Sequence, residues 1–133
     1  MIHINLFIVL VFAFVVPVAG AAVPSEQLLS AIAKVESDCN PSAIGDAGKA
    51  IGIYQIHRAY WQDAVDHDPS IGGEYKDCFN PEYARRIVIA YMDRYAPANA
   101  SDETLARIHN GGPRGHKKSA TLKYWSKVKK KMN

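Results

Sequence analysis

Apolar residues recur at helical spacing in several stretches of the chain. Between residues 26 and 38, Leu28, Leu29, Ile32 and Val35 follow one another at steps of one, three and three, which places them on one face of an amphipathic helix. The same kind of pattern predicts helices over residues 57–65 and 80–95, from 101 to the loop that begins at 109, and from about 121 to the end. The chain is therefore expected to be mainly helical.

Polar residues and prolines mark where three of these helices begin. Ser25 precedes the first helix and Ser101 the fourth, and a serine at this position accepts a hydrogen bond from a free backbone N–H of the first turn. The third helix begins with Asn80 and Pro81, a capping residue followed by a proline that fits the first helical position. These signals support the predicted boundaries.

Residues 42–56 have a different pattern, in which glycines alternate with β-branched residues. Gly45, Gly48 and Gly52 stand among four isoleucines, which predicts a short irregular hairpin with a glycine-rich tip. Residues 66–80 contain Gly72, Gly73 and a proline and are predicted to form a loop. Four or five helices and one small hairpin indicate an α+β domain that is mainly α.

Glu36 is the first candidate for chemistry. It lies four residues after Ile32, on or beside the apolar face of the first helix, so its carboxyl group is expected to be partly shielded from water. Shielding disfavours the charged form of a carboxyl group and suits a general acid that works near neutral pH. The alternative is a solvated residue at the helix edge.

The sequence around Glu36 resembles that of a known enzyme class. Glu36-Ser37, then Asn-Pro-Ser-Ala, Gly-Asp-Ala-Gly and Ala-Ile-Gly-Ile-Tyr-Gln-Ile resemble the active-site segment of the lysozyme-like superfamily. Residues 108–113, Ile-His-Asn-Gly-Gly-Pro, and 121–125, Thr-Leu-Lys-Tyr-Trp, look like those of invertebrate-type (destabilase-type) lysozymes. The resemblance runs from about residue 28 to 128. It implies a lysozyme-like domain in which a cleft separates the hairpin from the helices.

The resemblance also implies a function and a set of site residues. The expected enzyme is a secreted muramidase that hydrolyses the β-1,4 bond between N-acetylmuramic acid and N-acetylglucosamine in bacterial peptidoglycan. Glu36 is the expected acid and Asp46 the expected nucleophile or charge stabiliser, although Asp46 also fits a turn residue. Sugar rings need flat faces, polar side chains and exposed backbone, and the residues that offer these are Tyr54, Gln55, Tyr60, Trp61, Tyr95, His109, Asn110 and Gly111. The resemblance of the Tyr-Gln-Ile segment adds Ile56 to the residues expected to contact substrate.

Two other functions remain open. The sequence motifs around Glu36 are equally similar to those of lytic transglycosylases, which use one glutamate as acid and then base and need no second carboxylate. A non-catalytic, cationic protein that binds bacterial walls is the alternative from a different class.

The first 22 residues predict export from the cell. An apolar run over residues 6–16 is followed by Pro17 and the small residues Ala19, Gly20 and Ala21, as in a secretory signal peptide, and it is shorter than the roughly 20 residues of a membrane span. Residues 23–133 are then expected to form one extracellular domain. In an oxidising compartment Cys39 and Cys78 are expected to form a disulfide bond, although invertebrate-type lysozymes usually contain many more.

Charge is distributed unevenly along the chain. Residues 23–103 contain seven Lys or Arg and thirteen Asp or Glu, whereas residues 104–133 contain nine Lys or Arg and no acidic residue. The basic C-terminal tail favours a polyanionic partner, for which we expect the anionic bacterial surface rather than nucleic acid. We expect a monomer with no cofactor and no metal, since no spacing of histidines and acids fits a ligand set.

Overall fold

The computed structural model describes residues 20–133, and it contains five α-helices in this part of the chain. They are α1 (Glu26–Ser37), α2 (Arg58–His67), α3 (Pro81–Tyr95), α4 (Asp102–Gly111) and α5 (Leu122–Lys131). Most of the predicted signal peptide, residues 1–19, lies outside the described residues, so its cleavage stays a prediction. Within residues 20–133 no helix is long and apolar enough to cross a membrane.

The predicted capping residues begin three of the helices. The side chain of Ser25 accepts from the backbone N–H of Leu28, that of Asn80 from Tyr83 and that of Ser101 from Thr104. These bonds satisfy N–H groups that have no partner within the helix, which explains why the boundaries followed from the sequence. The predicted helix starts are confirmed to within about one residue.

The predicted hairpin is part of a small antiparallel sheet with three strands in the order β1-β2-β3. Strands β1 (Ile44–Gly45) and β2 (Ala50–Ile51) form the hairpin, and the 3₁₀ turn η1 (Asp46–Gly48) is its tip. Strand β3 (Ile56–His57) pairs with β2 and leads directly into α2. The third strand was not predicted, because a two-residue strand is too short to show an alternating pattern.

The predicted loop over residues 66–80 contains two 3₁₀ helices, η2 (Pro69–Ile71) and η3 (Tyr75–Phe79). Ile71 and Cys78 are buried in them, so this segment contributes to the core. Two further 3₁₀ turns, η4 (Gly115–Lys117) and η5 (Ser119–Thr121), join α4 to α5. Helix α4 is longer than predicted, because it includes His109, Asn110 and Gly111.

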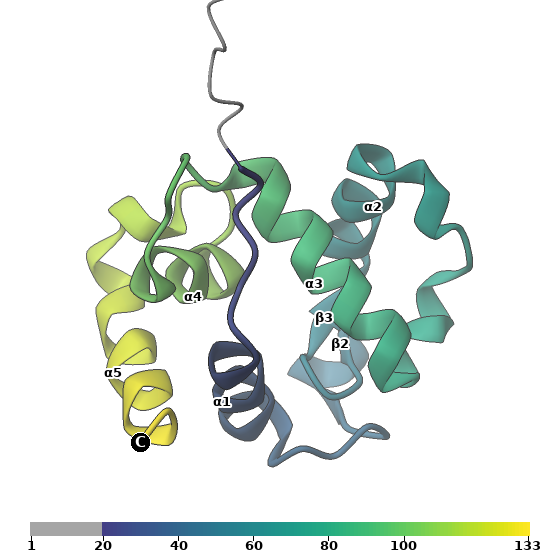
Figure 1. Ribbon diagram of the computed structural model, residues 1–133. Coiled ribbons are helices and arrows are strands. Elements are labelled where there is room, and N and C mark those ends of the chain that lie inside the picture. Colours follow the sequence, from purple (N-terminus) through teal and green to yellow (C-terminus); the bar gives the residue numbers. More distant parts are fainter. Residues whose placement is uncertain (1–19) are drawn as a thin grey trace, which may run out of the picture.

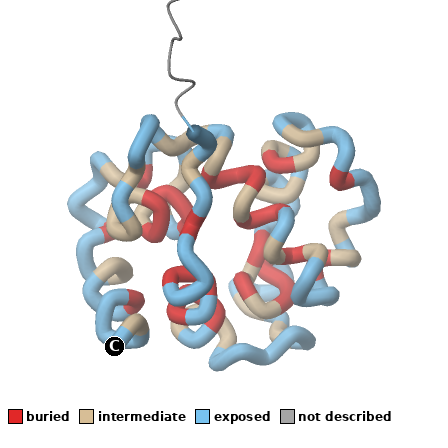
Figure 2. The backbone as a smooth tube through the Cα atoms, viewed as in Figure 1, coloured by how far each residue is buried: buried red, intermediate tan, exposed pale blue. Residues whose placement is uncertain are grey.

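Helix α3 runs between two groups of elements. Figure 1 shows α1, α4 and α5 on one side of it and α2 with the sheet on the other. Residues buried completely along α3 include Ala84, Ile87, Val88 and Met92, and the segments coloured as buried in Figure 2 face the interior from both groups. The predicted role of this helix as the buried centre of the domain is confirmed.

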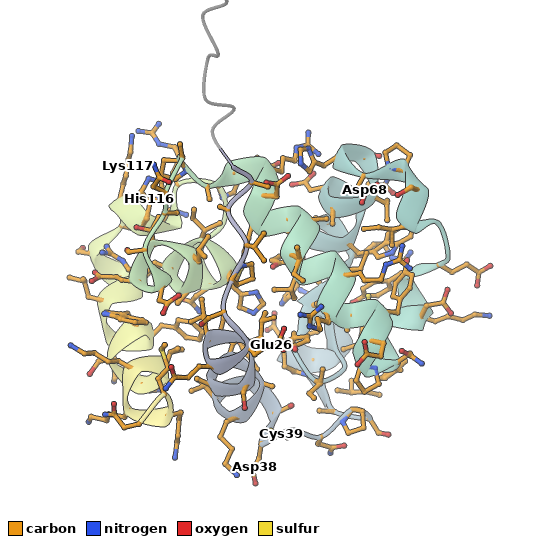
Figure 3. All side chains as sticks on the ribbon, in the orientation of Figure 1. Glu26, Asp38, Cys39, Asp68, His116 and Lys117 are labelled. Atoms are coloured by element: carbon orange, nitrogen blue, oxygen red, sulfur yellow. The ribbon has the colours of Figure 1, made fainter. Side chains whose placement is uncertain are left out.

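The predicted disulfide bond between Cys39 and Cys78 is wrong for this structure, in which both thiols are free. Cys39 is exposed at the end of α1, where it and Asp38 have left-handed backbone conformations, and Figure 3 shows both residues at one edge of the molecule. Cys78 is completely buried in the hydrophobic core, and this burial raises the pKa of its thiol to about 12. One thiol faces solvent and the other packs among apolar side chains, so they do not meet.

Candidate active site

A polar pocket of about 250 Å³ brings together residues from six elements. Its lining is Glu36, Asp46, Ala50, Gln55, His57, Tyr60, His109 and Asn110. Both predicted catalytic carboxylates are in this set, although they belong to α1 and to the tip of the hairpin. A larger pocket of about 390 Å³ around Ile71 and Ala90 contains none of the predicted site residues, so chemistry rather than size identifies the candidate site.

Glu36 lies in the last turn of α1, with its side chain 20% exposed. The hydroxyl of Tyr124 in α5 donates a 2.8 Å hydrogen bond to Oε1 of this carboxyl group. Nε2 of His109, from α4, lies 3.4 Å from the same oxygen. The shielding predicted from the helical pattern is therefore present, and side chains from two later helices provide it.

The next residue, Ser37, joins the end of α1 to the segment before β3. Its hydroxyl lies 2.7 Å from the backbone oxygen of Ile53 and accepts from the N–H of Asn40. Because this contact fixes the last turn of α1 against the sheet side of the molecule, it also fixes where Glu36 enters the pocket.

His109 is held almost entirely within the protein, with its side chain 3% exposed. Its Nδ1 lies 2.9 Å from the hydroxyl of Tyr60, and the ring of Tyr60 stacks on that of Tyr91 with centroids 3.6 Å apart. Burial raises the pKa of the Tyr60 phenol well above its ordinary value, with smaller contributions from Tyr91 and Glu36. Tyr60 is therefore a neutral O–H group at physiological pH.

Asp46 has a very different environment at the tip of the hairpin. Its side chain is 64% exposed, and one carboxylate oxygen lies 3.3 Å from Nε2 of His57 at the end of β3. Asp46 and Ala47 both have left-handed backbone conformations, which short polar residues such as aspartate tolerate well. The pocket thus contains one shielded carboxyl group and one solvated carboxylate.

The residues predicted to contact sugar divide into two groups. Gln55, Tyr60, His109 and Asn110 line the pocket. The other five do not line it. Tyr54 and Ile56 are buried in the core, and Gly111 packs beside Thr121. Trp61 donates a hydrogen bond to the hydroxyl of Tyr83, and Tyr95 donates one to the carboxylate of Asp63. Gln55 is held in place because its amide group donates to the backbone oxygens of Ala43 and Gly52.

Sequence reasoning missed two residues that contact the candidate carboxyl groups, Tyr124 and His57. Tyr124 stands in the Thr-Leu-Lys-Tyr-Trp motif, but the motif alone does not show that α5 returns to α1 and brings a phenol to Glu36. His57 directly follows the Tyr-Gln-Ile run, and the alternation of side chains along a strand is the signal that places it opposite the buried Ile56. Within residues 20–133, no group of three His, Cys, Asp or Glu side chains is positioned to hold a metal ion.

Comparisons with known proteins give the family. The destabilase family profile matches residues 25–131. The chain is 43% identical over 110 residues to Lysozyme 1 of Crassostrea virginica, and the match covers 78% of this chain and 58% of that protein. It is 39% identical over 118 residues to a lysozyme of Meretrix lusoria, and this match covers 84% of this chain and 93% of the M. lusoria protein. The structure matches that of the M. lusoria lysozyme in complex with PliI of Aeromonas hydrophila, with a TM-score of 0.69 and 38% identity over 80% of this chain and 89% of that one. The chain therefore belongs to the destabilase family of invertebrate-type lysozymes.

Proposed function

We propose that the chain is a muramidase that hydrolyses the β-1,4 bond between N-acetylmuramic acid and N-acetylglucosamine in bacterial peptidoglycan. The observation that carries the proposal is the pairing of Glu36 and Asp46 in one pocket with contrasting surroundings, one 20% and the other 64% exposed. Glycosidases with two carboxylates use such a contrast to keep one group protonated and the other ionised. Relatives named lysozymes, from 34% to 43% identical, support the same reaction.

The proposed reaction begins with Glu36. Its carboxylic acid gives a proton to the glycosidic oxygen, the bond to the anomeric carbon breaks, and the leaving sugar departs as an alcohol. Positive charge develops on the anomeric carbon, and the Asp46 carboxylate either bonds to it or stabilises it. A water molecule then attacks the anomeric carbon and gives its proton to Glu36; where Asp46 had bonded to that carbon, this bond breaks and the Asp46 carboxylate is regenerated.

Substrate contact is proposed for the pocket residues that have free polar atoms or exposed surface. Asn110 is exposed at the rim, and the oxygen of the Gln55 amide remains available because the nitrogen makes both backbone contacts. Amides of this kind bind the hydroxyl and acetamido groups of amino sugars through hydrogen bonds. His109 has both ring nitrogens directed at protein groups, which makes it a poorer sugar ligand than its place in the motif suggests.

Mass spectrometry of fragments from purified peptidoglycan tests the reaction. The wild type is expected to release fragments with reducing N-acetylmuramic ends, and both Glu36→Gln and Asp46→Asn are expected to release none or very few. Asp66→Asn, which changes an exposed aspartate outside the pocket, is the matched control. Fragments with 1,6-anhydro ends, still formed by Asp46→Asn, would instead identify a lytic transglycosylase in which Glu36 acts alone.

We also propose that the protein works outside the cell as a monomer and that its basic C-terminal tail draws it to anionic bacterial surfaces. Seven lysines and one arginine between residues 114 and 131 are exposed, and no acidic residue follows Glu103. The lysines of α5 are thus free to attract a polyanion over several ångströms. The mass of the chain recovered from the culture medium tests its export and the removal of the signal peptide. Sedimentation of the purified protein tests whether it is a monomer.

A further inference from the structure

Two separate side chains approach the same oxygen of Glu36. The hydroxyl of Tyr124 donates to Oε1 at 2.8 Å, and Nε2 of His109 lies 3.4 Å from Oε1. Within residues 20–133, no hydrogen bond or ion pair is made to Oε2. The two contacts come from α5 and α4, so the preference for one oxygen is built into the packing of the fold.

Burial decides which groups in this cluster keep their protons and therefore donate hydrogen bonds. Burial raises the pKa of the Tyr124 phenol far above its ordinary range, and the neighbouring Glu36 raises it further, so Tyr124 keeps its proton and is the donor. Tyr60 is also a neutral O–H group, as described above. When Tyr60 donates to Nδ1 of His109, the ring proton of neutral His109 is on Nε2, the nitrogen that faces Glu36. This assignment rests on the hydrogen-bond network.

We propose that Tyr124 and His109 are positioning residues that engage Oε1 of Glu36 and leave Oε2 as the oxygen that delivers the proton to the glycosidic bond. Tyr60 belongs to the same hydrogen-bond network, because its hydroxyl fixes the tautomer of His109. The inference rests on the proposed function for its chemical step.

The step is balanced with Glu36 as the acid. The Oε2–H bond breaks, a bond forms between that proton and the glycosidic oxygen, and the electrons of the broken glycosidic bond go to the leaving oxygen. Glu36 becomes a carboxylate. The donors at Oε1 stabilise this new negative charge without competing for the proton, because they contact the other oxygen.

Several titratable groups surround the Glu36 carboxyl group, so a test of Tyr124 must change its contact and leave the other groups in place. Tyr124 and His109 contact it, and Asp46, His57 and Tyr60 line the same pocket. Replacing Tyr124 by phenylalanine removes one hydroxyl and leaves the other four groups and the packed ring unchanged. Tyr95→Phe is the matched control, because its hydroxyl also donates to a carboxylate at 2.8 Å, that of Asp63, away from the pocket.

The first readout is independent of catalysis. Titration of the Glu36 carboxyl carbon is followed by NMR in protein labelled with ¹³C at glutamate. Loss of a donor to the ionised form is expected to move the midpoint upward by about half to one pH unit in Tyr124→Phe and by less in Tyr60→Phe. Tyr95→Phe is expected to leave it unchanged.

The second readout is the kinetics of peptidoglycan hydrolysis. In Tyr124→Phe, kcat at the pH optimum is expected to fall about three- to ten-fold with KM unchanged, the factor that corresponds to the expected change in the NMR midpoint, and the alkaline limb of the pH profile is expected to move upward with that midpoint. Tyr95→Phe should match the wild type in both respects.

The outcomes separate the two proposals. An unchanged Glu36 midpoint in folded Tyr124→Phe overturns the positioning role, whatever the activity. A shifted midpoint in a protein whose wild type releases no fragments supports the contact at Oε1 and refutes the muramidase reaction. An equal fall in kcat for Tyr124→Phe and Tyr95→Phe would show a general loss of structure and overturn the specific role.

Discussion

Nε2 of His57 lies 3.3 Å from a carboxylate oxygen of Asp46, and both side chains line the pocket that contains Glu36. A ring nitrogen at this distance can hold the orientation of the Asp46 carboxylate, the group that the proposed reaction sets against the positive charge on the sugar.

His57→Ala is therefore expected to lower activity. Without the imidazole, the Asp46 carboxylate loses this contact and is oriented less well toward the substrate. The expected fall in kcat/KM is about two- to three-fold, a small effect because the side chains are 48% and 64% exposed and solvent screens the pair. Initial rates on soluble peptidoglycan fragments measure this fall.

His67→Ala is the control for this experiment. His67 pairs with Asp93 at 2.9 Å, but neither residue lines the candidate site. A similar fall in His67→Ala would attribute the effect to general stability, and an unchanged kcat/KM in folded His57→Ala would contradict the proposed role of the contact with Asp46.

Much of the fold followed from local signals in the sequence. The capping bonds of Ser25, Asn80 and Ser101 involve residues within three positions, so a short window contains both partners. The third strand was missed for a different reason, because two residues are too few to show an alternating pattern even though its partner strand is close in the sequence. The contact between His109 at the end of α4 and Tyr60 joins residues 49 positions apart, which no short window contains.

The site shows the same division. The helical spacing before Glu36 predicted its shielding, but the shield itself consists of Tyr124, which is 88 residues away, and His109. The error about Cys39 and Cys78 has a related cause, since compartment indicates that thiols oxidise but not whether two of them meet. Whether Asp46 acts on substrate stays a prediction, and its place in the pocket supports it.

Gly52 is expected to be essential for stability. Its φ of +76° is in the left-handed region, and a Cβ atom there would lie 2.2 Å from the backbone oxygen of Cys78, which cannot move aside cheaply. Gly52→Ala should therefore lower the free energy of unfolding by at least about 2 to 3 kcal/mol, the sum of backbone strain and a steric clash. Urea denaturation followed by circular dichroism measures it.

Gly48→Ala separates the two contributions. Gly48 has a similar φ of +89°, but a Cβ atom there would meet nothing within 4 Å. Only the strain is expected in this variant, about 1 kcal/mol. Equal losses in both variants would show that the contact between Gly52 and Cys78 is unimportant.

The two thiols are expected to react at very different rates. In native protein at pH 8, a thiol reagent such as DTNB should modify exposed Cys39 within minutes and leave Cys78 unmodified until the protein unfolds, because Cys78 is buried and its pKa is about 12. Cys39→Ser should abolish the fast phase. A native mass two daltons below that of the reduced chain, with no reactive thiol, would instead demonstrate the disulfide bond that this structure lacks.

The raised pKa of Cys78 also has a consequence for stability in alkali. The folded protein retains this proton up to about pH 12, whereas an unfolded thiol loses it near pH 9. Between these values the unfolded state binds fewer protons, so the free energy of unfolding is expected to fall as pH rises. Cys78→Ala, compared with the wild type between pH 7 and pH 11 in urea, should show a weaker fall; an identical fall would assign the effect to the buried tyrosines.

The basic tail is best tested by removing charge rather than chain. Helix α5 packs on α1 and carries the buried Val128 and the Glu36 donor Tyr124, so truncation would damage the core and the site together. Lys129→Gln with Lys130→Gln changes two exposed side chains and should slow lysis of intact bacteria several-fold at low salt, with little effect near 0.5 M salt, where charges are screened within about 4 to 5 Å. Hydrolysis of short soluble fragments should be unchanged, because the pocket is intact.

Lys34→Gln with Lys76→Gln is the control for this experiment. It removes the same charge from two lysines that are paired with Asp38 and Glu74, and it should have a smaller effect on lysis. Equal slowing by both double variants would mean that net charge, and not the position of the tail, governs the encounter with the bacterial surface.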